Sequence, residues 1–454
     1  MTDCLAEYAW LPHGWNENIR IDVDSGGMFR VVAEDATAAE GQRLGRFVLP
    51  GMPNLHSHAF QRAMAGMAER QSGSEDNFWS WRETMYAFAG RVGPDELKAI
   101  AAQLYVEMLK AGYTQVCEFH YLHHQPDGKP YADPAAMSLA IIEAAREAGI
   151  GLTLLPVLYM TGGFDGRPLS ERQRRFGLDV DGYLRLVEKL RKMENSTLHV
   201  GIALHSLRAV PPEAMRVVLQ SPLADGPLHI HISEQIGEVQ DCLNVRGARP
   251  VEWLLDNAPV DARWCLVHAT HMTQDETRRV AESGAVAGLC PTTEANLGDG
   301  LFALRAYREA GGVLGIGSDS NISVSPVEEL RWLEYGQRLI TRHRNIAVSE
   351  SSASVGENLW GDALFGGAQA SGVAVGAIED GARADLIVLD DAAPLLAARD
   401  LDNVLDTFLF AGNVNLVRDA MVGGEWVVRN GHHRDEDRIA ARYRQTLEGL
   451  AQRV

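Results

Sequence analysis

Two histidines separated by a single residue, His56 and His58, lie in the segment 48–60, whose sequence is VLPGMPNLHSHAF. In a β-strand, alternate side chains point to the same face, so two imidazoles at the end of a strand are aimed at one point. Two nitrogen donors at one point can share a metal ion. Histidine pairs also occur as hydrogen-bonded core or surface residues, so a metal site requires further ligands elsewhere in the chain.

Further candidate ligands stand at the ends of three apolar segments downstream. His231 follows His229 near the carboxyl end of the first segment, and His268 and Asp319 each close another. Apolar runs of this kind are typical of buried parallel strands. Three histidines and one aspartate suit zinc, and nitrogen and oxygen donors also suit iron(II) or manganese. The sequence therefore predicts a metal site and leaves the metal open.

These candidate ligands lie at the ends of early, middle and late strands in an alternating β/α pattern. Functional residues at strand ends in such a pattern are typical of a (β/α)8 barrel. The order of elements agrees with this fold, because eight strand-like segments alternate with helical ones. Beyond the four segments above, we expect strands at 114–119, 151–158, 198–204 and 285–290, and helices at 95–110, 134–147, 181–193, 211–220, 250–257, 273–283 and 301–310.

The chain is longer than such a barrel needs. Its 454 residues exceed the roughly 250 of a plain barrel, so a second unit is expected. Strand-like stretches separated by turn residues occur at both ends, for example at 19–23, 29–33 and 385–390. We therefore predict an α/β protein with a metal-dependent TIM-like barrel over 49–370 and a small β-sandwich domain built from 1–48 and 371–454, the latter including a terminal helix at 436–450.

Nearly the whole chain resembles the deaminases of the amidohydrolase superfamily. The segments that carry this resemblance are LPGMPNLHSH, HISE, VHATH, GSDSN and ADLIVLD. Within the superfamily, the chain is most similar to the formimidoylglutamate deiminases, which convert N-formimidoyl-L-glutamate into N-formyl-L-glutamate and ammonia during histidine degradation. This narrower resemblance rests on HAFQR (58–62), FWSWR (78–82), EFHY (118–121) and HSLR (205–208).

The resemblance implies a role for individual residues. The implied metal ligands are His56, His58, His231 and Asp319. The implied catalytic residues are Glu234, His268 and Asp319, of which Glu234 and His268 transfer protons. The implied substrate pocket consists of Gln61, Arg82, Tyr121, His205 and Arg208. The resemblance also implies a homodimer.

A single divalent metal ion per subunit, expected to be zinc, agrees with the sequence. The strand predicted at 198–204 offers no lysine that could be carboxylated to bridge two metals. A metal ion lowers the pKa of a bound water toward neutrality, and Asp319 could accept the proton. Glu234 is placed to carry a proton to the leaving nitrogen, while His268 could hold or polarise the attacking oxygen. How the acid and base steps divide among these three residues stays open.

The net charge of −19 bears on the substrate. An anionic dicarboxylate would be repelled by the overall field unless the pocket supplied local cations, for which Arg82 and Arg208 are candidates. A structural role is the alternative for Arg82 and Tyr121, because the aromatic run at 78–81 could belong to a packed loop. We interpret His120, His123 and His124 as solvated loop residues, His229 as a support for the barrel or for the neighbouring ligand, and His271 as the start of a helix.

Composition excludes several other classes of protein. Five cysteines without C-x-x-C spacing indicate neither a disulfide framework nor a cysteine-zinc site, which fits a reducing cytoplasm. The N-terminus has no basic segment followed by an apolar core, and no uninterrupted apolar stretch approaches about 18 residues, so we expect neither export nor membrane spanning. The acidic balance argues against nucleic-acid binding, and no nucleotide-binding fingerprint follows a strand.

Two other functions are compatible with the same barrel. A deaminase of a heterocycle such as guanine or cytosine would keep every metal ligand but would need a flat, largely neutral pocket, so replacing Arg82 and Arg208 should hardly matter. A non-catalytic binding protein is the more distant alternative, since a fold alone does not fix a function. Loss of metal ligands would mark such a protein, whereas here the full set is present.

Overall fold

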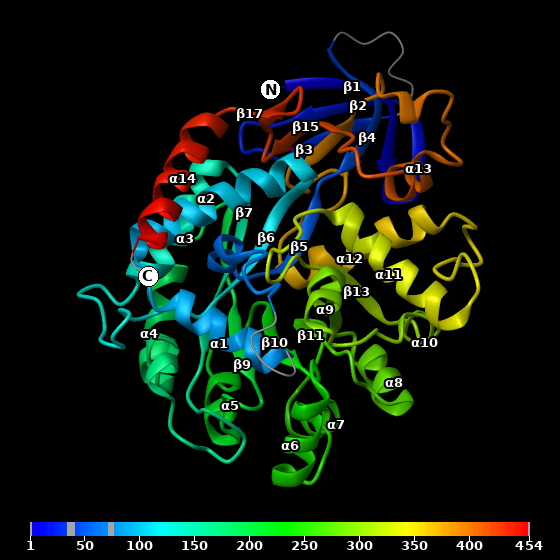
Figure 1. Ribbon diagram of the computed structural model, residues 1–454. Coiled ribbons are helices and arrows are strands. Elements are labelled where there is room, and N and C mark those ends of the chain that lie inside the picture. The colour runs from blue at the N-terminus through cyan, green and yellow to red at the C-terminus, as the bar shows by residue number, and fades with distance from the viewer. Residues whose placement is uncertain (1, 34–40, 71–76, 453–454) are drawn as a thin grey trace.

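A computed structural model describes residues 2–33, 41–70 and 77–452. Residues 1 and 34–40 of the predicted N-terminal unit, and 453–454 of the C-terminal one, lie outside the described residues. Figure 1 shows two layers of organisation: a barrel of strands wrapped by helices, and a sheet above it to which both chain ends contribute.

The larger unit is a parallel barrel sheet whose strands follow one another around the ring in chain order. The fourth position is an interrupted strand, split into β8 and β9. The strands are β5 (Met52–Ser57), β6 (Tyr113–His120), β7 (Gly151–Leu158), β8 (Leu198–Val200), β9 (Ile202–Ser206), β10 (Leu228–Ile232), β11 (Trp264–His268), β12 (Val286–Leu289) and β13 (Val313–Ile316). The predicted (β/α)8 architecture is confirmed.

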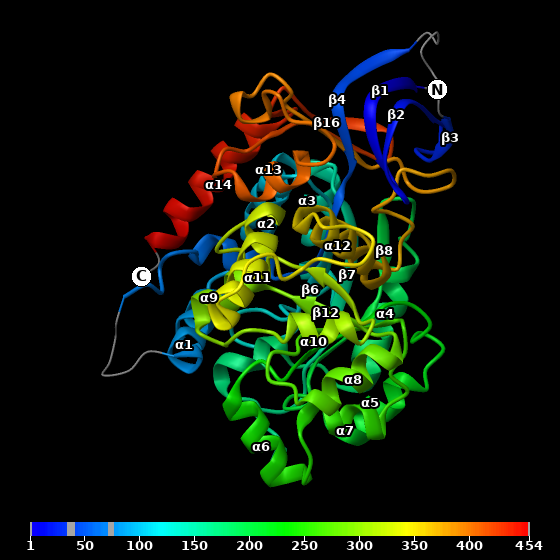
Figure 2. The same cartoon turned by 90° about the vertical axis from the view of Figure 1, so that its right-hand side faces the viewer.

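Helices cover the outside of the barrel and fill its loops (Figures 1 and 2). They are α1 (Phe78–Ala89), α2 (Pro94–Ala111), α3 (Ala136–Ala148), α4 (Val180–Arg191), α5 (Pro212–Leu219), α6 (Ile236–Arg246), α7 (Pro250–Asn257), α8 (Gln274–Ser283), α9 (Pro291–Leu297), α10 (Leu304–Glu309), α11 (Pro326–Thr341), α12 (Val355–Ser371), α13 (Val404–Phe410) and α14 (Glu436–Ala451). Short 3-10 helices occupy Ala59–Met64, Glu171–Phe176 and Pro394–Leu396. In the described part of the chain, no helix is both long enough and apolar enough to cross a bilayer.

The barrel closes between its first and last strands. The His58 amide donates to the Asp319 carbonyl at 3.0 Å, and the Asp319 amide donates to the His56 carbonyl at 2.9 Å. Gly317 allows this approach, because an added Cβ there would lie 2.8 Å from the Cβ and the carbonyl oxygen of His56. Backbone hydrogen bonds at the closure therefore join residues that lie about 260 positions apart in the chain.

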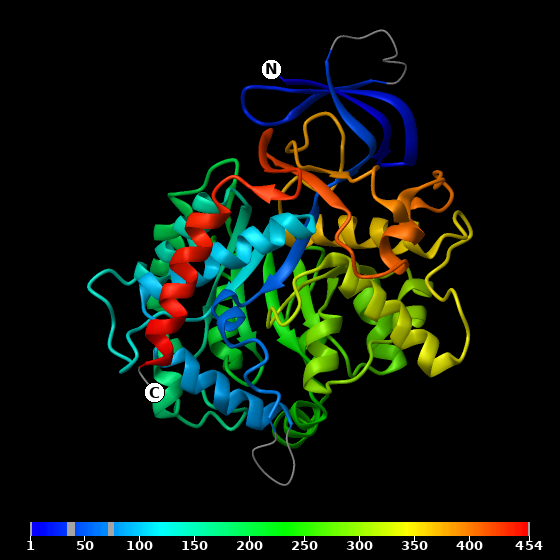
Figure 3. The ribbon, with the colours of Figure 1, turned by 45° about the horizontal axis from the view of Figure 1, so that its top comes forward.

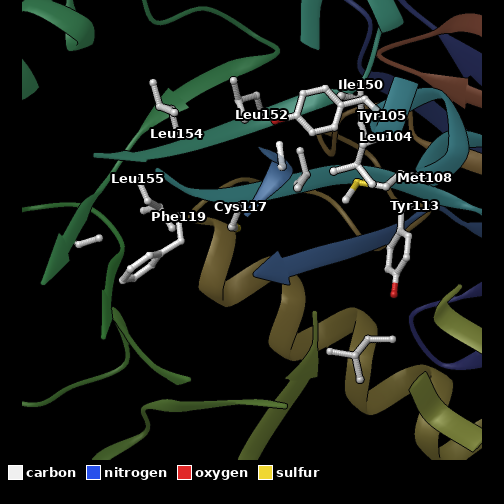
Figure 4. Packing of buried hydrophobic residues seen from close by; sticks show 14 of the residues in the cluster. Leu104, Tyr105, Met108, Tyr113, Cys117, Phe119, Ile150, Leu152, Leu154 and Leu155 are labelled. Atoms are coloured by element: carbon white, nitrogen blue, oxygen red, sulfur yellow. The ribbon is translucent and has the colours of Figure 1, made fainter. Parts of the chain in front are cut away.

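Helix α2 packs against the outer face of these strands. Leu104, Tyr105 and Met108 of α2 lie on the same side of the strands as Leu152 of β7, as Figure 4 shows, and all four are buried. Phe119 of β6 lies on the inner side, with its ring 4.3 Å from that of His231. Fully burying a large apolar side chain contributes about 1.5–3 kcal/mol. This packing fixes the strands whose carboxyl ends carry the polar residues described below.

The smaller unit is one sheet with strand order β17-β16-β15-β14-β4-β1-β2-β3. It mixes strands from both chain ends, which lie side by side above the barrel in Figure 3. Its strands are β1 (Thr2–Leu11), β2 (Gly14–Val23), β3 (Phe29–Ala33), β4 (Gln42–Pro50), β14 (Leu386–Leu389), β15 (Val417–Val422), β16 (Glu425–Arg429) and β17 (His432–His433). A second β-unit built from both ends was predicted and is found. The terminal helix α14 packs against α2.

A buried ion pair joins this sheet to the barrel. Arg383 donates to both carboxylate oxygens of Asp385, at 2.9 and 2.6 Å, and also to Gln115 of β6 at 2.9 Å. The two charged side chains are 2% and 0% exposed. Burial removes water from both charged groups, so the charge of each is stabilised by the charge of the other.

Replacing Asp385 with alanine is expected to destabilise the protein by about 3–5 kcal/mol, because it leaves the Arg383 charge buried without a partner. Chemical denaturation followed by circular dichroism measures the change. Glu282→Ala is the control: it breaks the exposed Arg278–Glu282 pair of α8 and should leave the denaturation midpoint unchanged. A D385A midpoint equal to that of the wild type would contradict the prediction.

Candidate metal centre and active site

Four side chains from three strand ends converge inside the barrel mouth. His56 and His58 come from the end of β5, His231 from β10, and Asp319 from the loop after β13. All four are buried. Their ligand atoms lie within 4.8 Å of one another, which makes them a group able to hold a metal ion.

The distances among these atoms are short. Nε2 of His56 lies 3.2 Å from Nε2 of His58 and 3.0 Å from Nε2 of His231. Oδ1 of Asp319 lies 3.4 Å from the Nε2 of His56 and 3.3 Å from that of His58. Ligands in a tetrahedral zinc site each stand about 2 Å from the ion and therefore about 3.3 Å from one another, so the donor set fits a zinc-sized cation.

Backbone carbonyls fix the tautomers of two of these histidines. Nδ1–H of His58 donates to the Phe119 carbonyl at 2.9 Å, and Nδ1–H of His231 donates to the His205 carbonyl at 3.0 Å. A carbonyl only accepts, so each Nε2 presents a lone pair to the centre. Burial lowers the pKa of all three histidines, that of His56 to about 3, which keeps the imidazoles neutral.

The carboxylate of Asp319 is held in its ionised form. Burial raises its pKa, but the hydrogen bond with His56 and the neighbouring imidazoles outweigh burial and hold the pKa below its usual range. The backbone here is strained: Asp319 has φ +44° and His268 has φ +71°, a region that side-chain-bearing residues seldom occupy. Strain of this kind persists where surrounding contacts impose it, and it gathers at functional sites.

A polar network holds the two halves of the centre in place. Asn54 donates to Oγ of Ser318 at 2.7 Å, and Ser318 donates in turn to Asn321 at 2.6 Å. The Asn321 amide then donates to the His58 carbonyl at 3.1 Å and to the Asp319 carbonyl at 3.0 Å. This buried chain connects β5 to the loop after β13, so it sets the positions of both histidines and of the aspartate.

Two further ionisable side chains stand beside the centre. Oε1 of Glu234 lies 3.7 Å from Nε2 of His268, and that nitrogen lies 3.9 Å from Oδ2 of Asp319. Burial raises the pKa of Glu234 to about 7. Burial lowers the pKa of His268, but the charge of Glu234, a hydrogen bond to Glu294 and the charge of Asp319 together raise it to about 10.

A narrow cavity opens directly onto these groups. Aromatic side chains of α1, including Phe78, Trp81 and Tyr86, form part of its wall. The residues predicted to bind substrate all reach it: Gln61, Arg82, Tyr121, His205 and Arg208. The structure therefore brings the predicted metal ligands, proton carriers and pocket residues around one space.

Polar atoms in this wall are left without protein partners. The Gln61 amide donates to the Tyr121 hydroxyl at 2.9 Å, while its own Oε1 is buried without a donor. In the described part of the chain, Nε of Arg82 and Nη1 of Arg208 are also buried without an acceptor. Unpaired buried polar atoms are costly, and a ligand that pairs them removes that cost.

The loop histidines differ from expectation. His120 and His123 are buried rather than solvated, and Nε2–H of His123 donates to the Val157 carbonyl at 2.9 Å. Nε2–H of His124 donates to the Gly177 carbonyl at 2.7 Å. The prediction was wrong because the 3-10 helix Glu171–Phe176 brings Arg175 over this loop, where its carbonyl accepts from the amides of His123 and His124.

Two other histidines occupy structural positions. Nε2–H of His229 donates to the Ala370 carbonyl of α12 at 2.8 Å. His271 precedes α8, which begins at Gln274 with Thr273 as its N-cap. His229 therefore supports the barrel against α12.

Several residues at the site were not predicted from the sequence. Glu294 of α9 lies with Oε1 3.3 Å from Nδ1 of His268 and also accepts from the Cys290 amide at 2.9 Å. Glu118 accepts from the Ala59 amide at 2.6 Å, directly behind His58, and burial raises its pKa to about 8. Such carboxylates contact the site histidines only in the folded chain, so the spacing of residues in the sequence does not indicate them.

Known proteins share both the sequence and the fold. The amidohydrolase family model matches residues 47–427. The formimidoylglutamate deiminase of Pseudomonas aeruginosa is 53% identical over 451 residues, 99% of this chain and 100% of that protein. The crystal structure of an amidohydrolase from Brucella melitensis has a TM-score of 0.93 at 46% identity, covering 99% of this chain and 100% of that one.

A more distant structure shows the fold alone. An adenosine deaminase from Xanthomonas campestris, solved with bound zinc, has a TM-score of 0.82 at 22% identity and covers 99% of this chain and 98% of that one. The family match spans most of the sequence, and a relative of more than half identity spans nearly all of it. The chain therefore belongs to the amidohydrolase family.

Proposed function

We propose that the protein is a zinc-dependent deiminase that hydrolyses N-formimidoyl-L-glutamate to N-formyl-L-glutamate and ammonia in histidine degradation. The observation that carries the proposal is one cavity lined both by His58, His231 and Asp319 of the metal-ligating group and by two arginines, each with one buried guanidinium nitrogen that lacks an acceptor. The Pseudomonas aeruginosa relative bears the name of this activity.

His56, His58, His231 and Asp319 would hold the zinc ion, one per subunit. When bound, the ion lowers the pKa of a coordinated water toward neutrality and so supplies the nucleophile at physiological pH. The Nε2 lone pairs of His58 and His231, the neutral imidazole of His56 and the ionised carboxylate of Asp319 make a donor set of the kind zinc prefers.

The remaining residues move protons. The oxygen of water forms a bond to the formimidoyl carbon, the bond from that carbon to the terminal nitrogen breaks, and both protons of the water end on the nitrogen that leaves as ammonia. Asp319 is placed to accept the first proton, and Glu234 to deliver protons to the leaving nitrogen. His268, 3.7 Å from Glu234 and 3.9 Å from Asp319, holds the developing oxyanion through Nε2.

The pocket residues orient the substrate. Arg82 and Arg208 each offer a planar pair of donors to a carboxylate, and the substrate carries two. Gln61, Tyr121 and His205 line the same cavity and provide hydrogen bonds to the formimidoyl group. A net charge of −19 makes such local cations necessary for an anionic substrate.

Purified, zinc-loaded protein is expected to release ammonia from N-formimidoyl-L-glutamate and not from guanine or cytosine. Arg208→Ala should raise KM for the formimino compound by about 10- to 100-fold, because a charge-assisted contact contributes about 1.5–3 kcal/mol. A coupled ammonia assay measures both. Release of ammonia from a heterocycle, at the same rate in R208A, would agree with the metal centre but would contradict the substrate assignment.

Glu294→Gln is expected to lower kcat by about 10- to 100-fold, as loss of a partner that orients a site histidine does. The carboxylate holds Nδ1–H of His268 and so directs Nε2 toward Glu234. The pKa of His268 should fall in this variant, which the pH profile of kcat measures. An unchanged profile with a full complement of zinc would show that Glu294 does not orient His268.

We also propose that the protein is a homodimer that acts in the cytoplasm. An apolar stripe on α11 is exposed, with Trp332 at 43%, Leu339 at 74% and Ile340 at 58%. Such a stripe favours contact with another protein surface, here a second copy. All five cysteines are free and buried, which suits a reducing compartment.

A further inference from the structure

Trp79, the second residue of α1, lies close to both guanidinium groups of the pocket. The Cζ atom of Arg82 stands 4.4 Å from the centre of the indole ring, and that of Arg208 stands 5.9 Å from it. Arg82 also lies 5.5 Å from the ring of Tyr86. One aromatic side chain therefore contacts both members of what we call the guanidinium pair, Arg82 and Arg208.

The indole is itself fixed from two sides. Its ring meets Phe78 edge-on at 5.1 Å. On the other side it lies against the first turn of α6, where a Cβ added to Gly237 would stand 3.6 Å from the indole carbon Cζ2. Because α6 directly follows Glu234, the indole is anchored to the same loop that carries a proposed proton carrier.

The guanidinium pair has no hydrogen-bonded carboxylate among the described residues. Nε of Arg82 and Nη1 of Arg208 are buried without acceptors. Arg208 is attracted only through space: burial lowers its pKa, but the charges of Glu238 and Glu234 outweigh burial and raise that pKa. Two like charges that approach the same ring repel each other, so a further attraction is needed to hold both at that ring. The negative face of an indole supplies that attraction, since cations within about 6 Å of the ring centre are stabilised.

We propose that Trp79 is a positioning residue that determines specificity for dicarboxylates. Its ring holds both guanidinium groups at a fixed separation before the substrate binds. Each group is then already in position for one of the two carboxylates of the same substrate. This inference rests on the proposed function, because it assigns the reason why that pocket takes a substrate with two carboxylates. Preorganisation of this kind improves binding by removing the cost of ordering the side chains.

Trp79→Leu keeps an apolar side chain but removes the aromatic face, and Trp79→Phe keeps a smaller face. We expect W79L to raise KM for N-formimidoyl-L-glutamate at least tenfold, or 1.4 kcal/mol, with kcat within twofold of the wild type. W79F should stay within threefold in KM. Trp426→Leu is the matched control, because it removes the Trp426–Arg429 stack in the terminal sheet, with its 4.3 Å separation, and should change neither constant.

A second substrate distinguishes loss of arginine positioning from a general folding defect in W79L. N-methylformamidine carries the reacting group without carboxylates, so W79L should hydrolyse it with the kcat/KM of the wild type. A loss in W79L of the same size on both compounds, or an unchanged KM for the dicarboxylate, would overturn the proposal.

Glutarate binding, measured by isothermal titration calorimetry on the zinc-loaded protein, distinguishes this inference from the proposed function. If the wild type fails to hydrolyse the formimino compound but binds glutarate, and W79L weakens that binding at least tenfold, the role of Trp79 stands and the proposed function fails. If hydrolysis occurs and W79L binds glutarate as the wild type does, the role of Trp79 fails and the function stands.

Discussion

Replacing Asp319 with asparagine is expected to lower kcat/KM for N-formimidoyl-L-glutamate by on the order of 10⁴-fold or more. The side chain contributes twice in the proposed mechanism: its carboxylate binds the metal, and it accepts the proton of the attacking water. Loss of a positioned base alone costs about 10²- to 10⁴-fold. The amide of asparagine is neutral, so it neither takes up a proton nor balances the charge of the ion.

Metal content and activity, measured on the same sample, test this prediction. We expect D319N to retain less zinc than the wild type after dialysis, and to remain inactive when zinc is restored in excess. Asp362→Asn is the control, because Asp362 of α12 pairs with Arg308 at 2.8 Å outside the cavity and should keep full activity. A D319N protein that regains more than about a hundredth of the activity with excess zinc would show that Asp319 acts as a ligand alone.

The sequence predicted the barrel and the convergence of its polar residues for a physical reason. A strand buried on both faces is a continuous apolar run, and such a run that ends in His or Asp places that side chain at the carboxyl edge. His56, His231 and Asp319 are far apart in the chain, but strands in parallel order around a closed ring bring all of their carboxyl ends together.

Helices inserted between strands could not be predicted in the same way. The sequence of α12 contains four glycines, which favour loops over helices when read alone. In the structure they permit close packing: a Cβ on Gly366 would stand 1.9 Å from the carbonyl oxygen of Leu314 in β13. The aromatic run at 78–81, for which a packed loop was one of two interpretations, begins helix α1, and Asn77 caps that helix by accepting from the Trp79 amide at 2.9 Å.

The substrate pocket was predicted only through resemblance, and its geometry needed the structure. Arg82 and Arg208 come from different elements, so no spacing in the sequence indicates that both lie against one indole. Glu294 reaches His268 in the same way, from a short helix after β12. Contacts made by loops across the barrel mouth depend on the tertiary fold rather than on local periodicity.

Replacing Glu234 with glutamine is expected to lower kcat by about 10²- to 10⁴-fold while leaving the zinc content unchanged, because Glu234 carries protons and is not placed among the metal ligands. Burial raises the pKa of Glu234 to about 7. The protonated acid is the form that delivers a proton, and it is lost as the pH rises through that pKa. In the wild type, kcat should therefore fall on the alkaline side of neutrality.

The E234Q profile tests whether this fall belongs to Glu234, since glutamine does not titrate and the alkaline limb should disappear from its residual activity. Glu238→Gln is the matched control: Glu238 is a buried carboxyl of α6 whose Oε2 accepts from the Glu234 amide at 3.2 Å, and an amide oxygen can accept the same bond. We expect E238Q to retain the alkaline limb and most of the activity. If the alkaline limb persists in E234Q, the proton donor is another group at the centre. His268, whose pKa is raised to about 10, is then the remaining acid beside the leaving nitrogen.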